Sequence, residues 1–505
     1  MSRLAGLVRS KVFAYYFGLE MEADAFSAAV RIPNFLQNLL GEGALSASLI
    51  PVYAALVARG DRREADRVAG AVASLLALAV SALVLIGVIA TPLFIDVIAP
   101  GFQGAKRDLT IQIVRILFPG AGLLVLSAWC LGVLNSHHRF LLSYTAPVMW
   151  NAAMIATLLI YGGSALPRLA TVLAWGSVAG SALQVIVQLP VVLRIAPDLK
   201  FGLDMASDHV KAVVRNFVPV FLSRGVVQVS AYVDAFIASF LPTGAVAAIT
   251  NAQLLYTLPV SLFGMSVSAA ELPAMSGALG LDPAGSENIR RRLNSGLRQI
   301  AFFVVPSAMA FLALGDVVAA AILQGGLFRH ADAIYVWGIL AGSGIGLLAS
   351  TLGRLYSSTY YALRDTRTPL RYALLRVLLT TVLGYIFAIP LPRILGIPSF
   401  WGAAGLTASA GLAGWVEMLM LRRKLNSRIG QTGLDLSHVA KLWTAAIGGA
   451  AAAWSVKVVL PGMHPTVSAI FVLGTYGLVF FGVTLLFRVP EAISFWNKVL
   501  KVQPF

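Results

Sequence analysis

Charged side chains are scarce in this chain, and acidic ones are the scarcest. Only 12% of the 505 residues are charged, with 22 acidic residues against 38 lysines and arginines, while 58% are hydrophobic. Soluble domains carry about twice that share of charge, so the composition indicates an integral membrane protein. The formal net charge of +16 would suggest nucleic acid in a soluble protein. Here the basic residues flank apolar runs, so we attribute them to membrane topology and expect no nucleic-acid partner.

Other features are missing as well. The apolar stretches show no alternation with period two, which argues against an outer-membrane barrel. The single cysteine, Cys130, lies in an apolar run and is expected to serve packing. We find no glycine-rich phosphate loop followed by Lys and Ser or Thr, no nucleophile–base set and no histidine-rich metal cluster. We therefore expect a protein that is not an enzyme and that has no cofactor and no resident metal.

Apolar runs long enough to cross a bilayer recur along the whole chain, because a spanning helix needs about 20 residues. The predicted fold class is all-α, a polytopic membrane protein with about fourteen transmembrane helices. The first span is short, as if the helix began within it. The predicted spans lie near residues 1–17, 25–56, 68–97, 109–136, 142–162, 168–194, 210–240, 243–276, 295–322, 332–361, 368–390, 399–421, 440–460 and 466–487.

The loops between these spans alternate in charge. One set is rich in arginine and lysine, as at 59–67, 290–298 and 422–428, and the alternate set is poor in both. Basic loops face the cytoplasm in most membrane proteins. This rule places both chain termini in the cytoplasm.

A faint internal repeat suggests two related halves. The segment "EGALSASLIPVY" at 42–53 is similar to "FGMSVSAAELPAM" at 263–275, and both lie in the second span of a six-span unit. Two pseudo-symmetric six-helix lobes followed by two extra helices would be a transporter-like plan. We predict an N-terminal lobe at 1–200, a C-terminal lobe at 201–430, and two additional helices with a short tail at 431–505.

Polar residues form a stripe along the second predicted span. Asp24, Arg31, Asn34, Asn38 and Glu42 project within roughly 80° of one another on a helix. A charge at mid-bilayer costs at least about 2.5–3.5 kcal/mol, so the stripe must face a water-filled cavity or a paired interior. Polar packing between helices is the alternative.

Helix-loosening residues occur in the same span and in the eighth. Pro33, Gly41 and Gly43 interrupt or loosen the second span, and glycine and proline also occur in the eighth. We therefore expect both spans to bend.

Further polar groups are spread over both halves and suggest one shared cavity. Plainer roles are open for some of them: snorkelling for Arg371 and Arg376, a structural ion pair for Arg224 with Asp234, and an interfacial position for Glu271. The polar residues of the other spans that we single out are Arg3, Arg9, Arg224, Asp234, Glu271, Arg354, Arg371 and Arg376.

Several segments, taken together and in order, resemble one transporter family. They include "SRLAGLVRSKVFAYYFG", "ADAFSAAVRIPNFLQNLLGEGALSASLIPVYA", "LFPGAGLLVLSAWCLGVLNSHHRF" and "YYALRDTRTPLR". Over essentially the full chain they resemble the MurJ/MviN family, the lipid II flippases of the multidrug/oligosaccharidyl-lipid/polysaccharide exporter superfamily. The resemblance implies two lobes around a central V-shaped cavity, with the last two helices forming a groove for a lipid tail.

The resemblance also implies a cargo and a place in the cell. Family members carry lipid-linked peptidoglycan precursor from the cytoplasmic to the periplasmic leaflet of the bacterial inner membrane, in the service of cell-wall biogenesis and cell shape. The cargo would be a polyprenyl-pyrophosphate bearing sugars and a peptide. Arginines suit its phosphates, because a guanidinium presents planar donors that stay charged. Cell-wall synthesis enzymes are expected partners.

Site residues follow from the resemblance position by position. Ser2, Arg3 and Arg9 match a functional serine and two arginines of the first helix, and Arg354 stands where some relatives carry lysine. The expected gating or ion-pair residues are Asp24, Glu42 and Asp234, and of these Asp24 and Glu42 would pair with the arginines when the cavity is empty. The expected substrate-binding residues are Ser2, Arg3, Arg9, Arg31, Asn34, Arg224 and Arg354.

The chain departs from the family pattern at several positions. Cavity arginines of well-studied relatives are replaced by Gln37 and Leu254, and Arg224 would supply a relocated charge. Some relatives bind sodium between the seventh and eleventh helices. Asp234 matches one ligand of that site, whereas Thr380 and Gly384 stand at the eleventh-helix positions. The expected coupling is therefore to the membrane potential or to a monovalent cation, with at most a weak sodium site at Asp234.

The resulting prediction is a flippase that moves lipid II by alternating access. A flippase for another polyprenyl-linked oligosaccharide remains an alternative, because two cavity arginines are missing. A cation-coupled drug antiporter of the same superfamily is another, and it would need fewer arginines. A non-transporting scaffold for cell-wall enzymes is the alternative from a different class, and it could lose the polar stripe without loss of function.

Overall fold

The computed structural model describes residues 2–204, 207–277, 283–459 and 462–500. Within these ranges the side chains are described except at residues 2, 42, 144, 219–220, 222–231, 283–284 and 498–500. The described backbone forms helices joined by turns, with one isolated bridge between Gly325 and Phe328 and no strand. The prediction of an all-α, polytopic membrane fold is confirmed.

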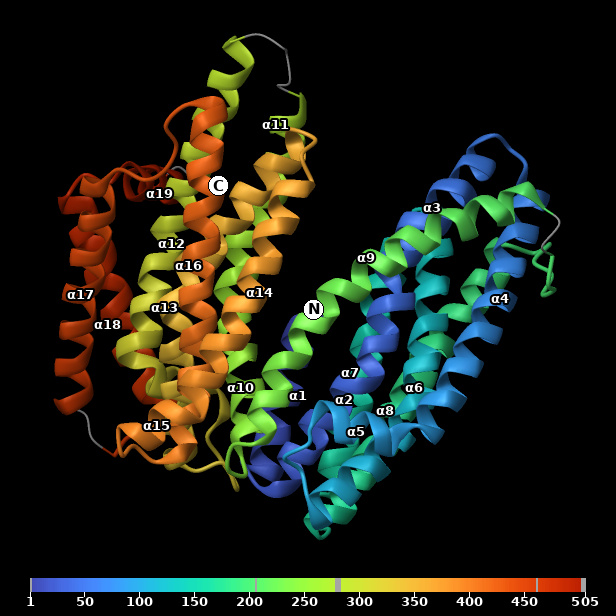
Figure 1. Ribbon diagram of the computed structural model, residues 1–505, viewed down its shortest axis with the longest axis horizontal. Helices are drawn as coiled ribbons and strands as arrows, with labels where there is room; N and C mark the ends of the chain where they lie inside the picture. Colours follow the sequence, from blue (N-terminus) through green and yellow to red (C-terminus); the bar gives the residue numbers. More distant parts are fainter. Residues whose placement is uncertain (1, 205–206, 278–282, 460–461, 501–505) are drawn as a thin grey trace. The chain divides into compact units, whose positions relative to one another are not determined.

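The chain forms two compact units, shown in sequence colours in Figure 1. Unit 1 comprises residues 1–247 together with 325–328, and unit 2 comprises 248–324 and 329–505. These are units of packing, and the boundary at 247/248 places α9 with unit 1, where it contacts α2, α3, α4 and α5. The division into lobes at 200/201 and 430/431 remains a prediction about the internal repeat.

Unit 1 contains nine helices among its described residues and the first residues of a tenth. The loop residues Gly325–Phe328 return to it from unit 2, where the backbone N–H of Leu327 donates to the carbonyl of Tyr15 at 2.9 Å. Its helices are α1 (Ser2–Phe17), α2 (Met21–Leu40), α3 (Glu42–Ala58), α4 (Arg62–Ile89), α5 (Thr91–Ile98), α6 (Gly104–Ser136), α7 (Phe140–Tyr161), α8 (Leu166–Ile195) and α9 (Asp208–Ser239).

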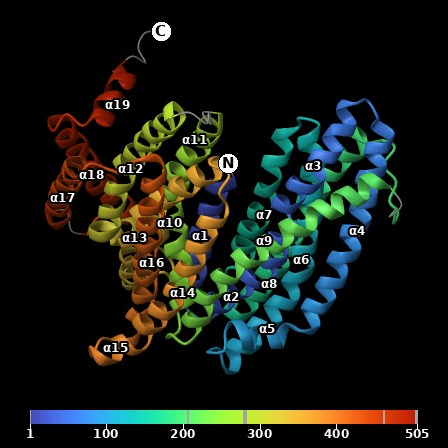
Figure 2. The same cartoon turned by 45° about the horizontal axis from the view of Figure 1, so that its top comes forward.

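Unit 2 continues from α10, whose first three residues belong to unit 1. Its last three helices, in red, lie together at one edge of this unit (Figure 2). Its elements are α10 (Ala245–Pro259), the π-helix η1 (Val260–Met265), α11 (Ser266–Gly277), α12 (Pro283–Leu323), α13 (His330–Ala362), α14 (Arg367–Ala388), α15 (Pro390–Ile394), the 3₁₀ turn η2 (Ser399–Trp401), α16 (Gly402–Ile429), α17 (Leu436–Val459), α18 (Pro465–Leu486) and α19 (Pro490–Leu500).

Twelve segments of the described chain are long and apolar enough to cross a membrane. α1 and α9 coincide with the remaining two predicted spans but are not among the twelve, and α1 has only 16 residues. The count of fourteen therefore stays a prediction.

Both spans expected to bend are irregular. Gly41 separates α2 from α3 with ψ near −148°, and its N–H donates to the carbonyl of Gln37. In the eighth span a π-helical turn, Val260–Met265, follows directly after Pro259. Proline and π-helical turns are the usual causes of such breaks, because both disturb the i to i−4 hydrogen-bond ladder.

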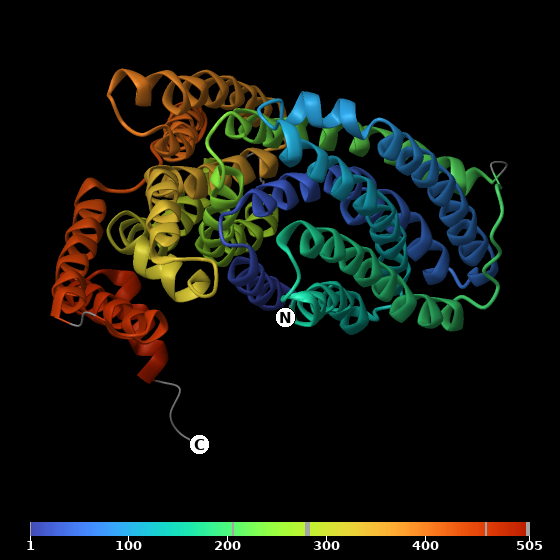
Figure 3. The ribbon, with the colours of Figure 1, turned by 90° about the horizontal axis from the view of Figure 1, so that it is seen from below.

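Unit 1 is held by two apolar cores, one packed on the first half of α6 and the other on its second half. One is built from α3, α4 and α6 and includes Leu49, Val72 and Trp129, whose indole N–H donates to the carbonyl of Ala69 at 3.1 Å. The other joins α1, α2 and α8 through Phe17, Phe26 and neighbouring residues. Figure 3 shows the start of the chain beside α7, in agreement with the packing of α1 on that helix. The helices α1 and α2, which carry several of the predicted site residues, are therefore packed within unit 1.

Candidate functional site

Arg9 lies on α1 among apolar residues and is half-buried. Its guanidinium lies over the ring of Trp150 on α7, with 4.7 Å between the Cζ atom and the ring centroid. Among the described side chains Arg9 forms no ion pair. The ring face attracts the cation without neutralising it, so the planar donors of Arg9 remain able to bind an anion.

Arg31 lies near the middle of α2. Its carbonyl accepts a hydrogen bond from the Tyr232 hydroxyl of α9 at 3.0 Å, and Asp234 of the same helix interacts with its guanidinium electrostatically. Tyr232 also packs edge-on against Phe35, with 5.6 Å between the ring centroids. The contact between α2 and α9 thus positions both the backbone and the charge of Arg31.

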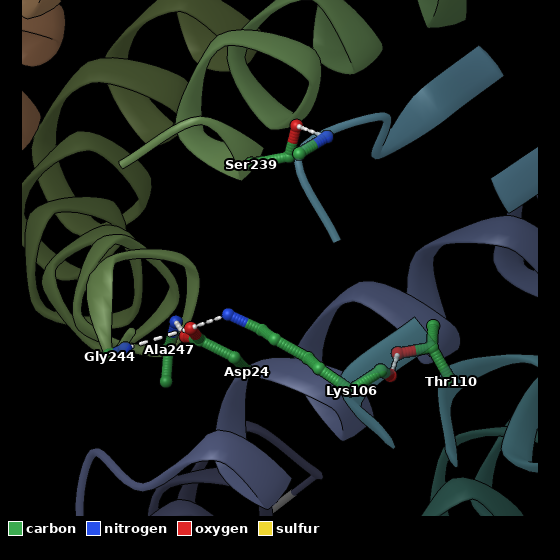
Figure 4. Close-up of polar contacts among 7 residues, drawn as sticks. Asp24, Lys106, Thr110, Ser239, Gly244 and Ala247 are labelled. Carbon is green, nitrogen blue, oxygen red and sulfur yellow. Dashed lines mark hydrogen bonds and ion pairs between the residues drawn. The ribbon is translucent and has the colours of Figure 1, made fainter. Parts of the chain in front are cut away.

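Asp24, in the first turn of α2, is fully buried and has three polar partners. One carboxylate oxygen, Oδ2, lies 2.6 Å from Lys106 Nζ of α6 and accepts the N–H of Gly244 at 2.8 Å. The other, Oδ1, accepts the N–H of Ala247 at 2.8 Å (Figure 4). Asp24 therefore caps the N-terminus of α10, where the helix dipole favours a negative charge.

The expected pairing of Asp24 with an arginine is wrong for this conformation. Its partner is Lys106, whose ammonium also lies 4.1 Å from the centroid of the Phe102 ring. Lys106 belongs to a loop-proximal segment that we assigned only to topology, and 82 positions separate it from Asp24. In the sequence Lys106 is followed directly by Arg107 and Asp108, and nothing there points to a partner so far away along the chain.

A second contact fixes the same end of unit 1. The N–H of Gly101 donates to the Ser239 hydroxyl at 3.1 Å, which joins the loop before α6 to the end of α9 (Figure 4). A Cβ at Gly101 would lie 2.1 Å from the Ser239 carbonyl oxygen, so only glycine allows this approach. The segment that carries Lys106 is thereby held close to the start of α10.

The remaining predicted residues are dispersed. Arg3 is exposed on α1, Asn34 is half-buried on α2, and Arg354 is exposed on α13 of unit 2. The side chains of Ser2, Glu42 and Arg224 lie outside the described part of the structure. Arg9, Arg31 and Asp24 thus lie in unit 1 together with Arg3, Asn34 and Asp234, whereas Arg354 lies in unit 2.

Arg376 and Glu271, for which snorkelling and an interfacial position were the alternatives, form ion pairs within unit 2. Arg376 binds Glu417 of α16 at 3.1 Å, and Glu271 lies 3.6 Å from Arg292 of α12. Arg371 is exposed at the start of α14.

The described residues contain no group of three or more His, Cys, Asp or Glu side chains that could hold a metal ion. Asp234 belongs to unit 1, whereas Thr380 and Gly384 belong to unit 2. A sodium site at Asp234 therefore stays a prediction.

Comparison with protein families gives one match over most of the chain. A family model described as "Lipid II flippase MurJ" matches residues 13–486. A protein of Burkholderia cenocepacia named lipid II flippase MurJ is 31% identical over 434 residues, which are 85% of this chain and 82% of that protein. A probable lipid II flippase MurJ of Rhizobium meliloti is 29% identical and covers 95% of this chain and 88% of its own length.

Comparison with solved structures shows the same fold. The structure of a lipid II flippase MurJ in an inward closed conformation matches with a TM-score of 0.79 and 23% identity, covering 96% of this chain and 97% of that one. An inward-facing multidrug resistance MATE family transporter of the MOP superfamily matches with a TM-score of 0.67 and 16% identity, over 85% of this chain and 95% of that one.

Proposed function

The chain belongs to the Lipid II flippase MurJ family, and from this premise we propose that it moves lipid II across the bacterial inner membrane by alternating access. The cargo would pass from the cytoplasmic to the periplasmic leaflet, with both chain termini in the cytoplasm as the basic loops indicate. The polyprenyl tail can remain in lipid while the polar head group crosses. No catalytic chemistry is needed for this transfer.

One observation carries the proposal at the level of side chains. Arg9 is a half-buried arginine on a membrane helix that forms no ion pair among the described residues and is positioned by the Trp150 ring. Keeping a charge in such a position is costly and marks a functional site by default. A pyrophosphate, which offers several charged oxygens, is the ligand that guanidinium groups bind best. Arg31, on the neighbouring helix α2, would supply a second contact.

Asp24 would hold the empty protein in one state. Its carboxylate fastens the start of α10, the helix by which the chain enters unit 2. Release of this contact, together with bending at Gly41 and at the π-helical turn Val260–Met265, would allow the two units to move as lobes. Asp24 is therefore proposed as a gating residue and not as a substrate ligand.

The driving force would be the membrane potential. Moving one negative charge outward gains about 2.3 kcal/mol per 100 mV of inside-negative potential, so transport needs no nucleotide hydrolysis. Coupling to a monovalent cation is the second possibility to be measured, by varying sodium at constant potential.

The test is complementation of cells depleted of their own lipid II flippase, with a leaflet-specific assay of lipid II. We expect Arg9→Ala and Arg31→Ala to abolish translocation at normal expression, because each removes a phosphate donor. Arg9→Lys and Arg31→Lys should restore only part of it, since lysine keeps the charge and loses the planar donor geometry. Arg63→Ala, at a side chain that is 92% exposed, is the matched control.

Full complementation by both alanine variants would remove these arginines from the site. Wild-type protein that fails with lipid II but moves another polyprenyl-linked oligosaccharide would change the cargo. A protein that supports growth without translocating any lipid would act as a scaffold for cell-wall enzymes.

A further inference from the structure

An open hollow lined by both charged and apolar residues lies on unit 1, at the end where α4, α5 and α6 meet. It encloses about 650 Å³ between α5, α6 and α8. Arg107, Asp108, Gln112 and Arg115 of α6 line it, with Thr171 and Trp175 of α8 opposite. None of these residues belongs to the flippase site described above. The hollow is lined by both acidic and basic side chains, and their positions along α6 indicate which charged groups a ligand would need.

The outer part of the hollow is acidic and the inner part basic. Arg107 is already neutralised by Asp96, with Nε–Oδ1 and Nη2–Oδ2 distances of 2.8 and 3.0 Å. Asp108 remains largely exposed and lies only 4.0 Å from the shared Arg107. Two turns further into the membrane, Arg115 donates one hydrogen bond, from Nε to the Val88 carbonyl at 3.3 Å, and has no carboxylate partner among the described residues.

The charge pattern of α6 predicts that Arg115 lies near the level of the lipid phosphates. The chain from residue 116 to residue 138 contains no Asp, Glu, Lys or Arg, and about 20 residues of helix cross the hydrocarbon core. Arg115 therefore stands where that core begins. Trp175, which is 58% exposed on α8, is of the residue type that prefers this interface. A free guanidinium at this level is placed to bind a phosphate.

A second, more apolar hollow lies next to the first along α6. It encloses about 520 Å³ between α4 and α6 and is lined by Ser81, Val84 and Val88 on α4 and by Pro119, Gly122 and Leu126 on α6. Val88 is the residue whose carbonyl binds Arg115. Gln112, Arg115, Pro119, Gly122 and Leu126 follow one another at intervals of three or four residues, so they form one face of α6. The two hollows are therefore neighbours along α6, and we refer to them together as the groove.

We propose that this groove binds one aminophospholipid of the surrounding bilayer, such as phosphatidylethanolamine. Its phosphate binds Arg115, its ammonium group lies toward Asp108, and one acyl chain fills the space between α4 and α6. From Val88 to Ala77 the groove runs about 16 Å along α4, close to the half-thickness of a hydrocarbon core of about 30 Å. That length suits an ordinary acyl chain and is too short for a polyprenyl tail.

The charge order favours this head group over others. A purely anionic lipid would bring its phosphate to Arg115 but would gain nothing from Asp108. A choline head group carries a quaternary ammonium that cannot donate a hydrogen bond to a carboxylate. Specific recognition therefore requires both a phosphate and a primary ammonium.

The experiment is native mass spectrometry of the purified full-length protein in detergent, titrated separately with phosphatidylethanolamine, phosphatidylglycerol and phosphatidylcholine. We expect one phosphatidylethanolamine to bind about tenfold more tightly than the other two. Arg115→Gln should weaken its binding about tenfold, and Asp108→Asn should remove the preference over phosphatidylglycerol. Arg168→Gln is the matched control, an exposed arginine of α8 outside the groove.

A second variant tests the acyl part without touching a charge. Ser81→Phe places a ring in the groove from an exposed position, whereas Ala82→Phe places it on the adjacent exposed position outside the groove. We expect only Ser81→Phe to reduce binding. Equal affinity for all three lipids, unchanged binding in Arg115→Gln or Ser81→Phe, or one-for-one displacement by undecaprenyl phosphate would each overturn the proposal.

Discussion

Each unit contains a buried aspartate bound to a lysine, and the two pairs differ in what else the aspartate binds. In unit 1 Asp24 is fully buried and lies 2.6 Å from Lys106, which stacks on Phe102. In unit 2 Asp316 of α12 is 6% exposed and lies 2.5 Å from Lys457 of α17, whose ammonium lies 5.2 Å from the Trp454 ring. Judged as ion pairs alone, the two are equivalent.

The two pairs differ in the other hydrogen bonds that the aspartate carboxylate accepts. Asp24 also accepts two backbone N–H groups at the start of α10. Asp316 Oδ1 is buried and has no hydrogen-bond partner among the described residues. Burying a charge costs several kcal/mol and is repaid only when its other lone pairs are satisfied. Asp24 therefore belongs to a complete network that joins three helices, whereas Asp316 makes a simple fastening between α12 and α17.

The largest expected effect is that of removing the Asp24 carboxylate. Asp24→Ala leaves Lys106 and two helix N–H groups without their acceptor, so we expect it to lower the free energy of unfolding by about 3–5 kcal/mol. Asp24→Asn should lose less, because the amide oxygen can still accept one N–H. Thermal unfolding of the detergent-purified protein measures both. Asp208→Ala, at a side chain that is 96% exposed, is the control, and equal melting temperatures for the two alanine variants would contradict the network.

Apolar replacement of both partners should distinguish the two pairs. Lys457→Met alone leaves Asp316 as an unpaired buried charge and should cost about 1–3 kcal/mol. Adding Asp316→Leu should restore most of that loss, because a simple buried ion pair can be replaced by apolar side chains at little cost. The equivalent double replacement at Asp24 and Lys106 should not recover, since Gly244 and Ala247 would still lack an acceptor. Recovery of both doubles in unfolding measurements would show that the backbone donors contribute nothing.

The smallest change in stability is expected for Asp365, an aspartate outside the apolar spans that, like Asp24, binds both a helix N–H and a basic side chain. Half-buried Asp365 accepts the N–H of Thr368 in the first turn of α14 at 2.9 Å and binds Arg428 at 2.8 Å. These contacts, the Thr368 amide first, lower the pKa of Asp365 from 3.8 to about 2. Because the pKa is lower in the folded state, the stabilisation is complete above the ordinary pKa and is lost as the pH falls toward 2.

Asp365→Ala should therefore lower the free energy of unfolding by about 1 kcal/mol at neutral pH, the usual value of a helix cap. The difference from wild type should shrink as the pH is lowered through 4 and 3. Pulse proteolysis at a series of pH values measures this dependence. A difference that stays constant across the series would mean that the carboxylate charge is not the cause.

The general architecture followed from the sequence because hydropathy and loop charge are local properties. Membrane helices and the breaks at Gly41 and in the eighth span could be predicted from residues close in sequence, and the family resemblance drew attention to Asp24, whose role stays a prediction. The partners of Asp24 could not, because Lys106 and Gly244 lie 82 and 220 positions away. The position of Arg9 over Trp150 was missed for the same reason, since the two residues are far apart in the sequence and nothing near either of them predicts the contact.

The short loop Gly325–Phe328 has a consequence for dissecting the protein. It belongs to unit 1 by its packing, yet it is encoded between two helices of unit 2. A gene cut after residue 247 would consequently yield a first fragment whose Tyr15 carbonyl has lost the Leu327 amide. Co-expressed halves would regain this bond only if the loop Gly325–Phe328 of the second fragment packed into the first. Reassembly of a split protein therefore requires insertion of this loop as well as contact between the fragments.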